Sequence, residues 1–422
     1  MCRSKGATSS SSPSERSEPV ADLATFLPFA AFCLLGGVLV GRGVGGEVGR
    51  LLPLAVVTRL LGSVARYEVL ERFYSGVGDA KRYFGYGVIH AADLRAFDFS
   101  FLAPPETRPW WGTRFIENLS AFVVLLIGDN IRSGFLAFAL FSLTGVTLCV
   151  LAFRNAGHDE RGYARWLLLW PSLCFWPCSM GKDAVMILGI GLCVYGYVGL
   201  AGRFRLLPLV AGVTLLTCIR PHIAVLVAFA LVAAELFGSS AREGGWWRVA
   251  LMVGMGAAAA VIGLSQFGLD ISDLEGIQEQ FEAASVRTIK GGSAIERGSG
   301  IAAIPMALVN SLMRPFPWEA HHVFALFASL EVWGFWVYVA ARRRVLRDAL
   351  IGWRQDRMVR FSLPVGLLLA FFYGLAMSNL GIIARQRVVI LPFLFVLVAL
   401  RRTEGVRALR PATPALRPRV VG

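Results

Sequence analysis

Charged residues are scarce in this chain of 422 residues. They make up 17% of it, against about a quarter in soluble proteins, while 56% of the residues are hydrophobic. Apolar runs long enough to cross roughly 30 Å of hydrocarbon recur along most of the sequence. A helical backbone satisfies its own polar groups in such a layer. The sequence therefore predicts an all-α polytopic transmembrane helical bundle without a soluble catalytic domain.

Several motifs are missing as well. The chain has no Walker A sequence, no Gly-rich fingerprint after a strand, and no filter-like or repeated segment. The formal net charge is +14, but the sequence contains no basic, aromatic-interleaved module of the kind that binds nucleic acid. The excess of Arg is therefore expected to set the orientation of the helices in the membrane and to contact anionic lipid. Cys174 and Cys178 lie one helical turn apart with no His beside them, which favours buried small side chains over a metal pair.

Ten apolar runs have convincing length or flanks, and three weaker runs are short or interrupted by Arg. The ten runs are 21–41, 134–153, 166–181, 184–201, 206–219, 223–237, 249–267, 322–340, 361–378 and 388–400. The weaker runs are 51–70, 115–127 and 301–313, which could span, re-enter or lie in the interface. The sequence thus predicts about 10 to 13 helices.

Three parts follow from this pattern: a disordered tail at 1–20, a transmembrane domain at 21–400, and a basic tail at 401–422. Larger polar loops at 71–114 and 268–321 are expected to carry interfacial helices.

The positions of arginine in the short loops predict which side of the membrane each loop faces. The basic segments are 154–165, 203–205, 242–248, 342–360 and 401–419. If all of them are cytoplasmic, the ten firm runs alternate without conflict and both termini are cytoplasmic, in a cell (inner or plasma) membrane. The number of additional crossings must then be even, so 51–70 and 115–127 either both cross the membrane or both stay on one side of it.

Cations also lie on the predicted exoplasmic side, where few are expected. They are Lys182 beside Asp183, Arg220 near His222, Arg314 near Glu319, and Arg385 with Arg387. The run that ends before Arg220 is only about 21 Å long, so this cation is expected below the headgroups. Such cations together would bind an anion. The alternatives are snorkelling to lipid phosphate and, for Arg314 with Glu319, a structural ion pair.

A carboxylate follows the first membrane segments in the stretch Gly78-Asp79-Ala80-Lys81-Arg82-Tyr83. Asp79 could accept a proton from an attacking sugar hydroxyl, with Tyr83 in support and His222 as the second candidate base. The alternative is a helix N-cap, for which Asp is favoured. Weaker candidates in the same segment are Asp93, Asp98 and Glu106.

The order of these features resembles a known family. An acid in the first exoplasmic loop is followed by Thr113-Arg114-Phe115-Ile116 through Ile127-Gly128-Asp129-Asn130 and then by a long helix. This layout looks like that of the C-type (GT-C) glycosyltransferases, which take sugars from polyprenyl-phosphate carriers. The ending Asn379-Leu380-Gly381 with Arg385-Gln386-Arg387 resembles O-antigen-polymerase-like and ligase-like proteins of bacterial surface-polysaccharide clusters.

The resemblance implies a role for each matching position. Asp79 would be the base or metal-linked acid, and Arg220, Arg385 and Arg387 would hold the lipid phosphate or diphosphate. We also assign Lys182 and Arg314 to the phosphate, with Tyr83, Arg114, Asp183 and Glu319 in support. The first-loop acid is single here, where many family members carry an adjacent acidic pair. No metal ligand is therefore assigned, and a divalent metal stays an alternative.

The favoured interpretation is an integral membrane glycosyltransferase or polysaccharide polymerase that uses polyprenyl-linked sugars at the exoplasmic face. Its partners would be the lipid bilayer, a polyprenyl-linked glycan and other polysaccharide assembly proteins, and not nucleic acid. The main alternative is a lipid-linked glycan transporter or flippase, which should show an internal repeat and charges in mid-helix. A non-catalytic component of a polysaccharide assembly complex is the third interpretation.

Overall fold

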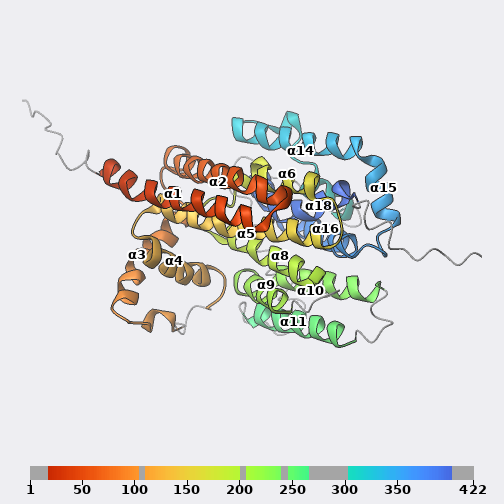
Figure 1. Cartoon of the computed structure of the whole chain (residues 1–422), viewed down its shortest axis with the longest axis horizontal. Coiled ribbons are helices and arrows are strands. Elements are labelled where there is room, and N and C mark those ends of the chain that lie inside the picture. Colours follow the sequence, from red (N-terminus) through yellow and green to blue (C-terminus); the bar gives the residue numbers. More distant parts are fainter. Residues whose placement is uncertain (1–17, 104–109, 200–205, 239–245, 266–302, 402–422) are drawn as a thin grey trace, which may run out of the picture.

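The computed structural model describes residues 18–103, 110–199, 206–238, 246–265 and 303–401, and these residues form helices and connecting turns without a β-strand (Figure 1). The α-helices are α1 (Glu18–Val44), α2 (Gly46–Phe73), α3 (Asp79–Arg95), α4 (Thr113–Ile127), α5 (Ile131–Asn155), α6 (Glu160–Leu169), α7 (Pro171–Phe175), α8 (Lys182–Gly199), α9 (Leu206–Ile219), α10 (Pro221–Leu236), α11 (Trp246–Ser265), α13 (Ala303–Leu312), α14 (Val323–Ala341), α15 (Arg343–Ile351), α16 (Arg357–Ala376), α17 (Leu380–Gln386) and α18 (Leu391–Ala399). Short 3-10 turns are η2 (Ser100–Leu102), η5 (Pro317–Glu319) and η6 (Arg387–Val389).

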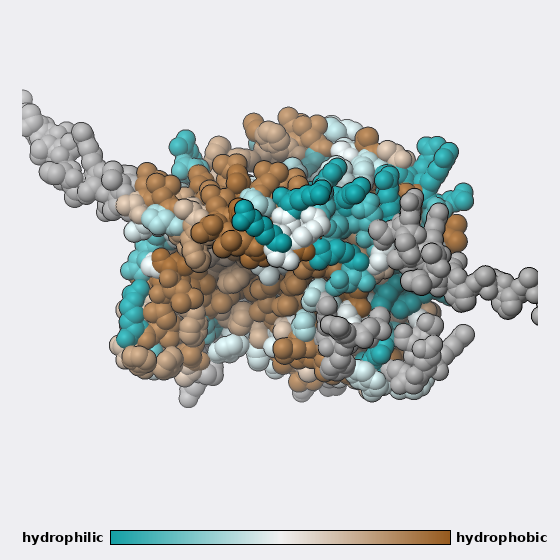
Figure 2. Space-filling model, viewed as in Figure 1, coloured by the Kyte–Doolittle hydropathy of each residue, from teal (hydrophilic) through white to brown (hydrophobic). Residues whose placement is uncertain are grey.

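Seven of these helices are long and apolar enough to cross a membrane. They are α1, α2, α5, α8, α11, α14 and α16, and the pair formed by α17–η6 and α18, bent by 58°, makes an eighth if it is one span. On the face shown in Figure 2, hydrophobic residues cover much of the left and central part, and hydrophilic residues gather mainly over the right-hand part, with a smaller group at the left edge. The protein is an all-α, multi-pass membrane protein, as the composition predicts. Most of the predicted loop 268–321 and most of each predicted tail lie outside the described residues, and residues 18–20 of the first tail belong to α1.

Polar residues set where several helices begin. Asn130 precedes α5 and accepts hydrogen bonds from the backbone N–H groups of Arg132 and Ser133 at 3.0 and 3.1 Å. Asp356 caps α16 in the same way, and Asn379 caps α17. Each cap satisfies backbone donors that have no partner within the helix.

Three of the basic segments meet at one end of the bundle, which we call the basic end. The Asp159 N–H donates to the carbonyl oxygen of Arg401 at 2.7 Å, and His158 Nε2 lies 2.9 Å from Asp356 Oδ2. The opposite end, where α2 stops and α3 begins, we call the Asp79 end; α3 and α4 lie there, at the left of Figure 1. Three of the five segments predicted to share one side are therefore together in the part of the chain that the structure describes.

The weak run at 51–70 crosses the bundle as part of α2. This helix starts beside Glu160, which accepts the Glu47 N–H at 2.6 Å at the basic end, and it stops at the Asp79 end. Arg59 in its middle is fully buried and donates to the Leu168 carbonyl at 3.3 Å and to Cys174 Sγ at 2.7 Å. The Arg faces the protein interior and not lipid, which makes it compatible with a membrane helix.

The other weak run, 115–127, forms α4 and does not cross. It packs on α3 as a hairpin at the Asp79 end, and the chain then enters α5 from that same end. Asn130 Nδ2 donates to Thr25 Oγ1 at 2.8 Å, so α1 also starts there, whereas Arg401 lies at the basic end. The start of α1 and Arg401 therefore lie at opposite ends of the bundle. Segment 51–70 runs through the bundle and 115–127 does not, whereas the predicted topology required these two runs to behave alike.

Candidate functional site

A cavity of about 650 Å³ opens at the Asp79 end. Its walls come from α2, α3, the start of α8, the junction of α9 with α10, and α17. The polar residues that line it include Asp79, Arg82, Tyr83, Lys182, Arg220 and Arg385. The helix ends of distant parts of the chain thus bring one predicted base and three predicted phosphate ligands into one space.

Asp79 is the first residue of α3, and its side chain is 68% exposed within this region. The N-cap position belongs to Gly78, and no side chain makes a capping hydrogen bond there. The nearest ion-pair partner is Arg82, whose Nη2 lies 3.6 Å from Asp79 Oδ1. The carboxylate is therefore not used as a cap, and it can reach a bound molecule.

Asp183 organises the floor of the cavity. Its side chain is only 1% exposed, and it accepts a hydrogen bond from Arg385 Nε. Arg220 Nη2 lies 3.9 Å from Asp183 Oδ1, and Gln386 Nε2 lies 3.4 Å from the same oxygen. Arg220 Nη1 also donates to Gln386 Oε1 at 2.5 Å. One buried carboxylate and one amide therefore hold two guanidinium groups in fixed positions at the cavity wall.

Two further cations have no carboxylate partner among the described residues. Lys182 makes no ion pair there. Arg66 on α2 lies over the rings of Phe175 and Trp176, with 5.1 and 5.2 Å from its Cζ to the ring centroids, and its buried Nε has no hydrogen-bond partner. A cation in that position is costly unless an anion or water accompanies it.

The charges around the cavity do not balance. Five cations line the wall: Arg66, Arg82, Lys182, Arg220 and Arg385. Asp79 is the carboxylate in the lining, and two more contact the cations from behind the wall, namely the buried Asp183 at Arg220 and Arg385 and Glu117, 3.6 Å from Arg82 Nε. Preorganised cations in a partly enclosed site at low dielectric attract and stabilise anions much more strongly than in water. The arrangement is suited to a phosphate or diphosphate.

Tyr83 supports Asp79 from the next turn of α3. Its ring is 2% exposed, and burial, with a further contribution from the charge of Asp79, raises the pKa of its phenol. The phenol therefore stays neutral and keeps a proton to donate.

The other predicted phosphate ligands lie elsewhere. Arg387 donates from Nε to the Ser311 carbonyl at 2.8 Å and from Nη2 to the Arg314 carbonyl, so it closes the end of α13. Arg314 pairs with Glu319, as in the structural alternative, and its Nε lies 3.1 Å from Glu319 Oε2. Burial alone would raise the pKa of Glu319, but the Arg314 hydrogen bond and charge and the Phe316 N–H lower it below its usual value.

Two more predicted residues also lie outside the lining of the cavity. His222 stacks on Phe372, with ring centroids 5.1 Å apart. Arg114 donates to the Phe101 carbonyl at 2.7 Å and lies over the Tyr86 ring, so it stabilises the hairpin of α3 and α4.

Sequence reasoning did not assign Arg66, Arg82 or Gln386 to the site. Arg66 appeared only as an interruption of an apolar run, although a cation within a membrane helix is itself a signal of function. Gln386 lies between two cations that were assigned, and its neutral amide gave no signal of its role as a bridge.

In the part of the chain that the structure describes, no three His, Cys, Asp or Glu side chains gather closely enough to hold a metal ion. The chain matches no protein-family model, no curated protein and no solved structure, so the resemblance drawn from its motifs stays a prediction.

Proposed function

We propose that the protein is a membrane glycosyltransferase or polysaccharide polymerase that uses sugars carried on a polyprenyl phosphate or diphosphate. The observation that carries this proposal is the cavity in which Asp79 faces Lys182, Arg220 and Arg385. It supplies what transfer from such a donor requires, namely a base for the acceptor and cations for the leaving phosphate.

The chemistry follows from these groups. The acceptor hydroxyl oxygen attacks the anomeric carbon of the donor sugar, and its proton passes to the Asp79 carboxylate. The bond between the anomeric carbon and the phosphate oxygen breaks, and the phosphate leaves with the electron pair. Arg220 and Arg385, held by Asp183, stabilise the charge that develops on that oxygen.

The location of the site supports a lipid-linked donor. The cavity lies at the ends of apolar helices, where a phosphate attached to a membrane-bound chain would reside. The basic end takes the cytoplasmic side by the positive-inside rule, which puts the Asp79 end on the exoplasmic side of the cell membrane. Other polysaccharide assembly proteins would then supply the donor or take up the product.

A lipid-linked glycan flippase is the rival function. A transporter needs a site near the middle of the bilayer that opens to each side in turn. Here the cations lie at one end of the bundle, and the buried Asp183 behind the cavity wall holds Arg385 and Gln386 in place. This one-sided arrangement favours transfer over transport.

The test uses the purified protein in phosphatidylcholine liposomes with a panel of undecaprenyl-phosphate and undecaprenyl-diphosphate sugars. We expect Asp79→Asn to lower transfer by about 10²-fold or more, the usual contribution of a general base. Asp93→Asn is the matched control, because Asp93 lies on the same helix and contacts His90 outside the cavity.

Arg385→Gln should also abolish most transfer, and a chelator in a parallel reaction tests the metal alternative. Equal transfer by the wild-type protein and Asp79→Asn would refute the assignment of the base. Movement of a fluorescent lipid-linked sugar across the bilayer without any transfer would identify the flippase instead.

A further inference from the structure

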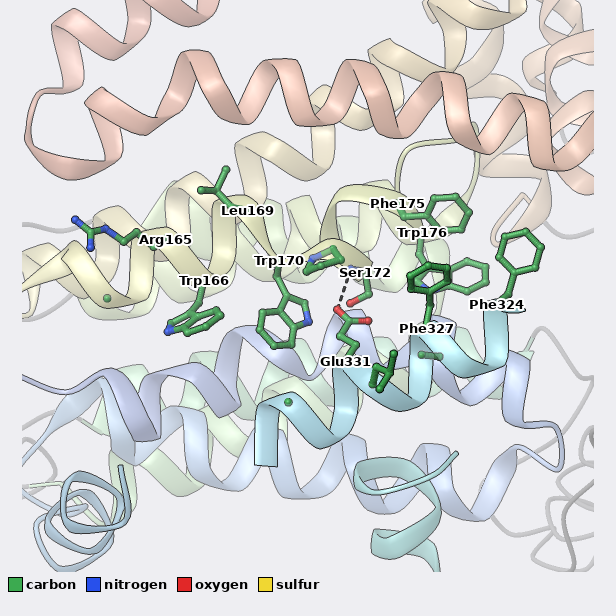
Figure 3. Close-up of a pocket in the computed structure, with 15 residues that line it drawn as sticks. Arg165, Trp166, Leu169, Trp170, Ser172, Phe175, Trp176, Phe324, Phe327 and Glu331 are labelled. Carbon is green, nitrogen blue, oxygen red and sulfur yellow. Dashed lines mark hydrogen bonds between the residues drawn. The ribbon is translucent and has the colours of Figure 1, made fainter. Parts of the chain in front are cut away.

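A large apolar groove runs along the outside of the bundle between α6–α7 and α14. It has a volume of about 1060 Å³, at the upper limit of ordinary ligand sites. Figure 3 shows Trp166, Trp170 and Trp176 from α6–α7 facing Phe327 and Glu331 of α14. α14 stands at the edge of the bundle (Figure 1), and its Phe327 is 67% exposed, so the groove opens to the lipid.

The groove and the cationic cavity adjoin one another through shared lining residues. A third space of about 440 Å³ lies between them and shares Phe175, Trp176 and Ala328 with the groove. It shares Arg66 and Trp176 with the cavity. Arg66 thus lies where an apolar passage meets the phosphate-binding wall. Its guanidinium lies over the rings of Phe175 and Trp176, and Trp176 lines both spaces.

The charges along the passage differ from one end to the other. Cations gather at the Asp79 end, whereas the groove carries the carboxyl group of Glu331, which accepts the Ser172 N–H at 2.9 Å at the break between α6 and α7 (Figure 3). Arg165 lines the far end of the groove and is paired with Glu47, to which its Nε donates at 2.9 Å. A phosphate is attracted to the first and not to the second. A molecule with a phosphate at one end and a hydrocarbon chain at the other therefore fits in one direction only.

We propose that this groove binds the hydrocarbon chain of the lipid phosphate whose headgroup occupies the cationic cavity. The occupant is a single long chain, which enters sideways from the bilayer between α7 and α14 and passes Arg66. The inference rests on the proposed function for its headgroup site, and it adds where the rest of the carrier lies. A chain in the groove is no less apolar in its surroundings than a chain in the bilayer, so the groove contributes by positioning. It holds the chain in place and thereby keeps the phosphate at Arg385 and Arg220.

The test measures binding of radiolabelled undecaprenyl phosphate and of the short-chain citronellyl phosphate to the full protein in phosphatidylcholine nanodiscs. Ala328→Trp fills the junction, and Gly334→Trp fills the groove at a position where a Cβ meets no atom within 4 Å. Ala340→Trp is the matched control, because Ala340 lies on the same helix, is exposed and lines neither space.

We expect both groove variants to weaken undecaprenyl phosphate binding roughly tenfold or more and to leave citronellyl phosphate binding unchanged, because the added ring competes with the chain alone. The control should bind both probes as the wild type does. Wild-type binding of undecaprenyl phosphate by both groove variants would overturn the proposal, as would equal weakening by the control.

Competitors separate the sources of the bound phosphate. Phosphatidylglycerol that competes as well as undecaprenyl phosphate would reduce the groove to an ordinary lipid contact and refute the proposal. If inorganic diphosphate displaced undecaprenyl phosphate and the free hydrocarbon chain did not, the phosphate alone would account for binding, and the proposal would be refuted as well. If Arg385→Gln binds both probes as tightly as the wild type, the headgroup site fails, and that result is distinct from a failure of the groove alone.

Discussion

Replacing Asp183 with Asn should destabilise the protein strongly, because it removes the only carboxylate in contact with Arg220 and Arg385 among the described residues. The substitution preserves shape and removes one charge. At 3.9 Å and an effective dielectric constant of roughly 20, the attraction between Arg220 and Asp183 is about 4 kcal/mol. The substitution also removes the cost of burying the Asp183 charge, which offsets part of that energy. We therefore expect the free energy of unfolding to fall by about 3 kcal/mol.

The measurement is the free energy of unfolding in mixed micelles of a mild detergent and SDS. Asp348→Asn is the control, because that carboxylate is 74% exposed and its pairing with Arg347 contributes little. The double variant Asp183→Asn with Arg385→Gln should be less destabilised than the sum of the two single variants, since it removes the charge that the first change leaves unpaired. A loss below about 0.5 kcal/mol for Asp183→Asn would refute the reasoning.

Three further predictions follow from other contacts. Gly145→Val should cost about 3 kcal/mol in unfolding experiments, because a Cβ there would lie 2.2 Å from the backbone oxygen of α8, whereas Gly36→Val, with open space around it, should cost little. Burial alone would raise the pKa of Asp356, but the His158 hydrogen bond and charge and the caps of α16 hold it below 3.8. The stability that this carboxylate contributes is complete above about pH 4 and is lost as the pH falls through the lowered pKa. Asn can still cap the helix, so the variant Asp356→Asn should lose less stability than the wild type on acid titration. Arg387→Met should lower stability by about 1 to 3 kcal/mol and leave undecaprenyl phosphate binding intact, because Arg387 binds carbonyls outside the cavity.

The route of the chain through the membrane could be predicted only in part. Composition and the length of the apolar runs were enough to predict an all-α membrane bundle. The crossing by α2 was harder to foresee, because Arg59 and Arg66 lower its apparent hydropathy although both point into the protein. Sequence reports that a cation is present in a run and not which face of the helix it occupies, and the cost of a charge depends on that face.

Arg385 and Arg387 show the same limit within three residues. Successive residues on a helix turn by about 100°, so side chains two apart point to nearly opposite faces. One guanidinium enters the cavity, and the other closes α13. The helical period could have shown that only one of the two reaches a given pocket. Which of them does so depends on the rotation of α17, which is set by packing.

The amino-acid sequence by itself determined the helical membrane fold and a first-loop carboxylate with cations near helix ends, because hydrophobicity and local charge are properties of short segments. Only the tertiary structure decided that Asp79, Lys182, Arg220 and Arg385 share one cavity while Arg314 and Arg387 do not. It alone created the groove between α7 and α14. Both features arise between helices far apart in the chain, and their geometry depends on how those helices rotate and pack against one another.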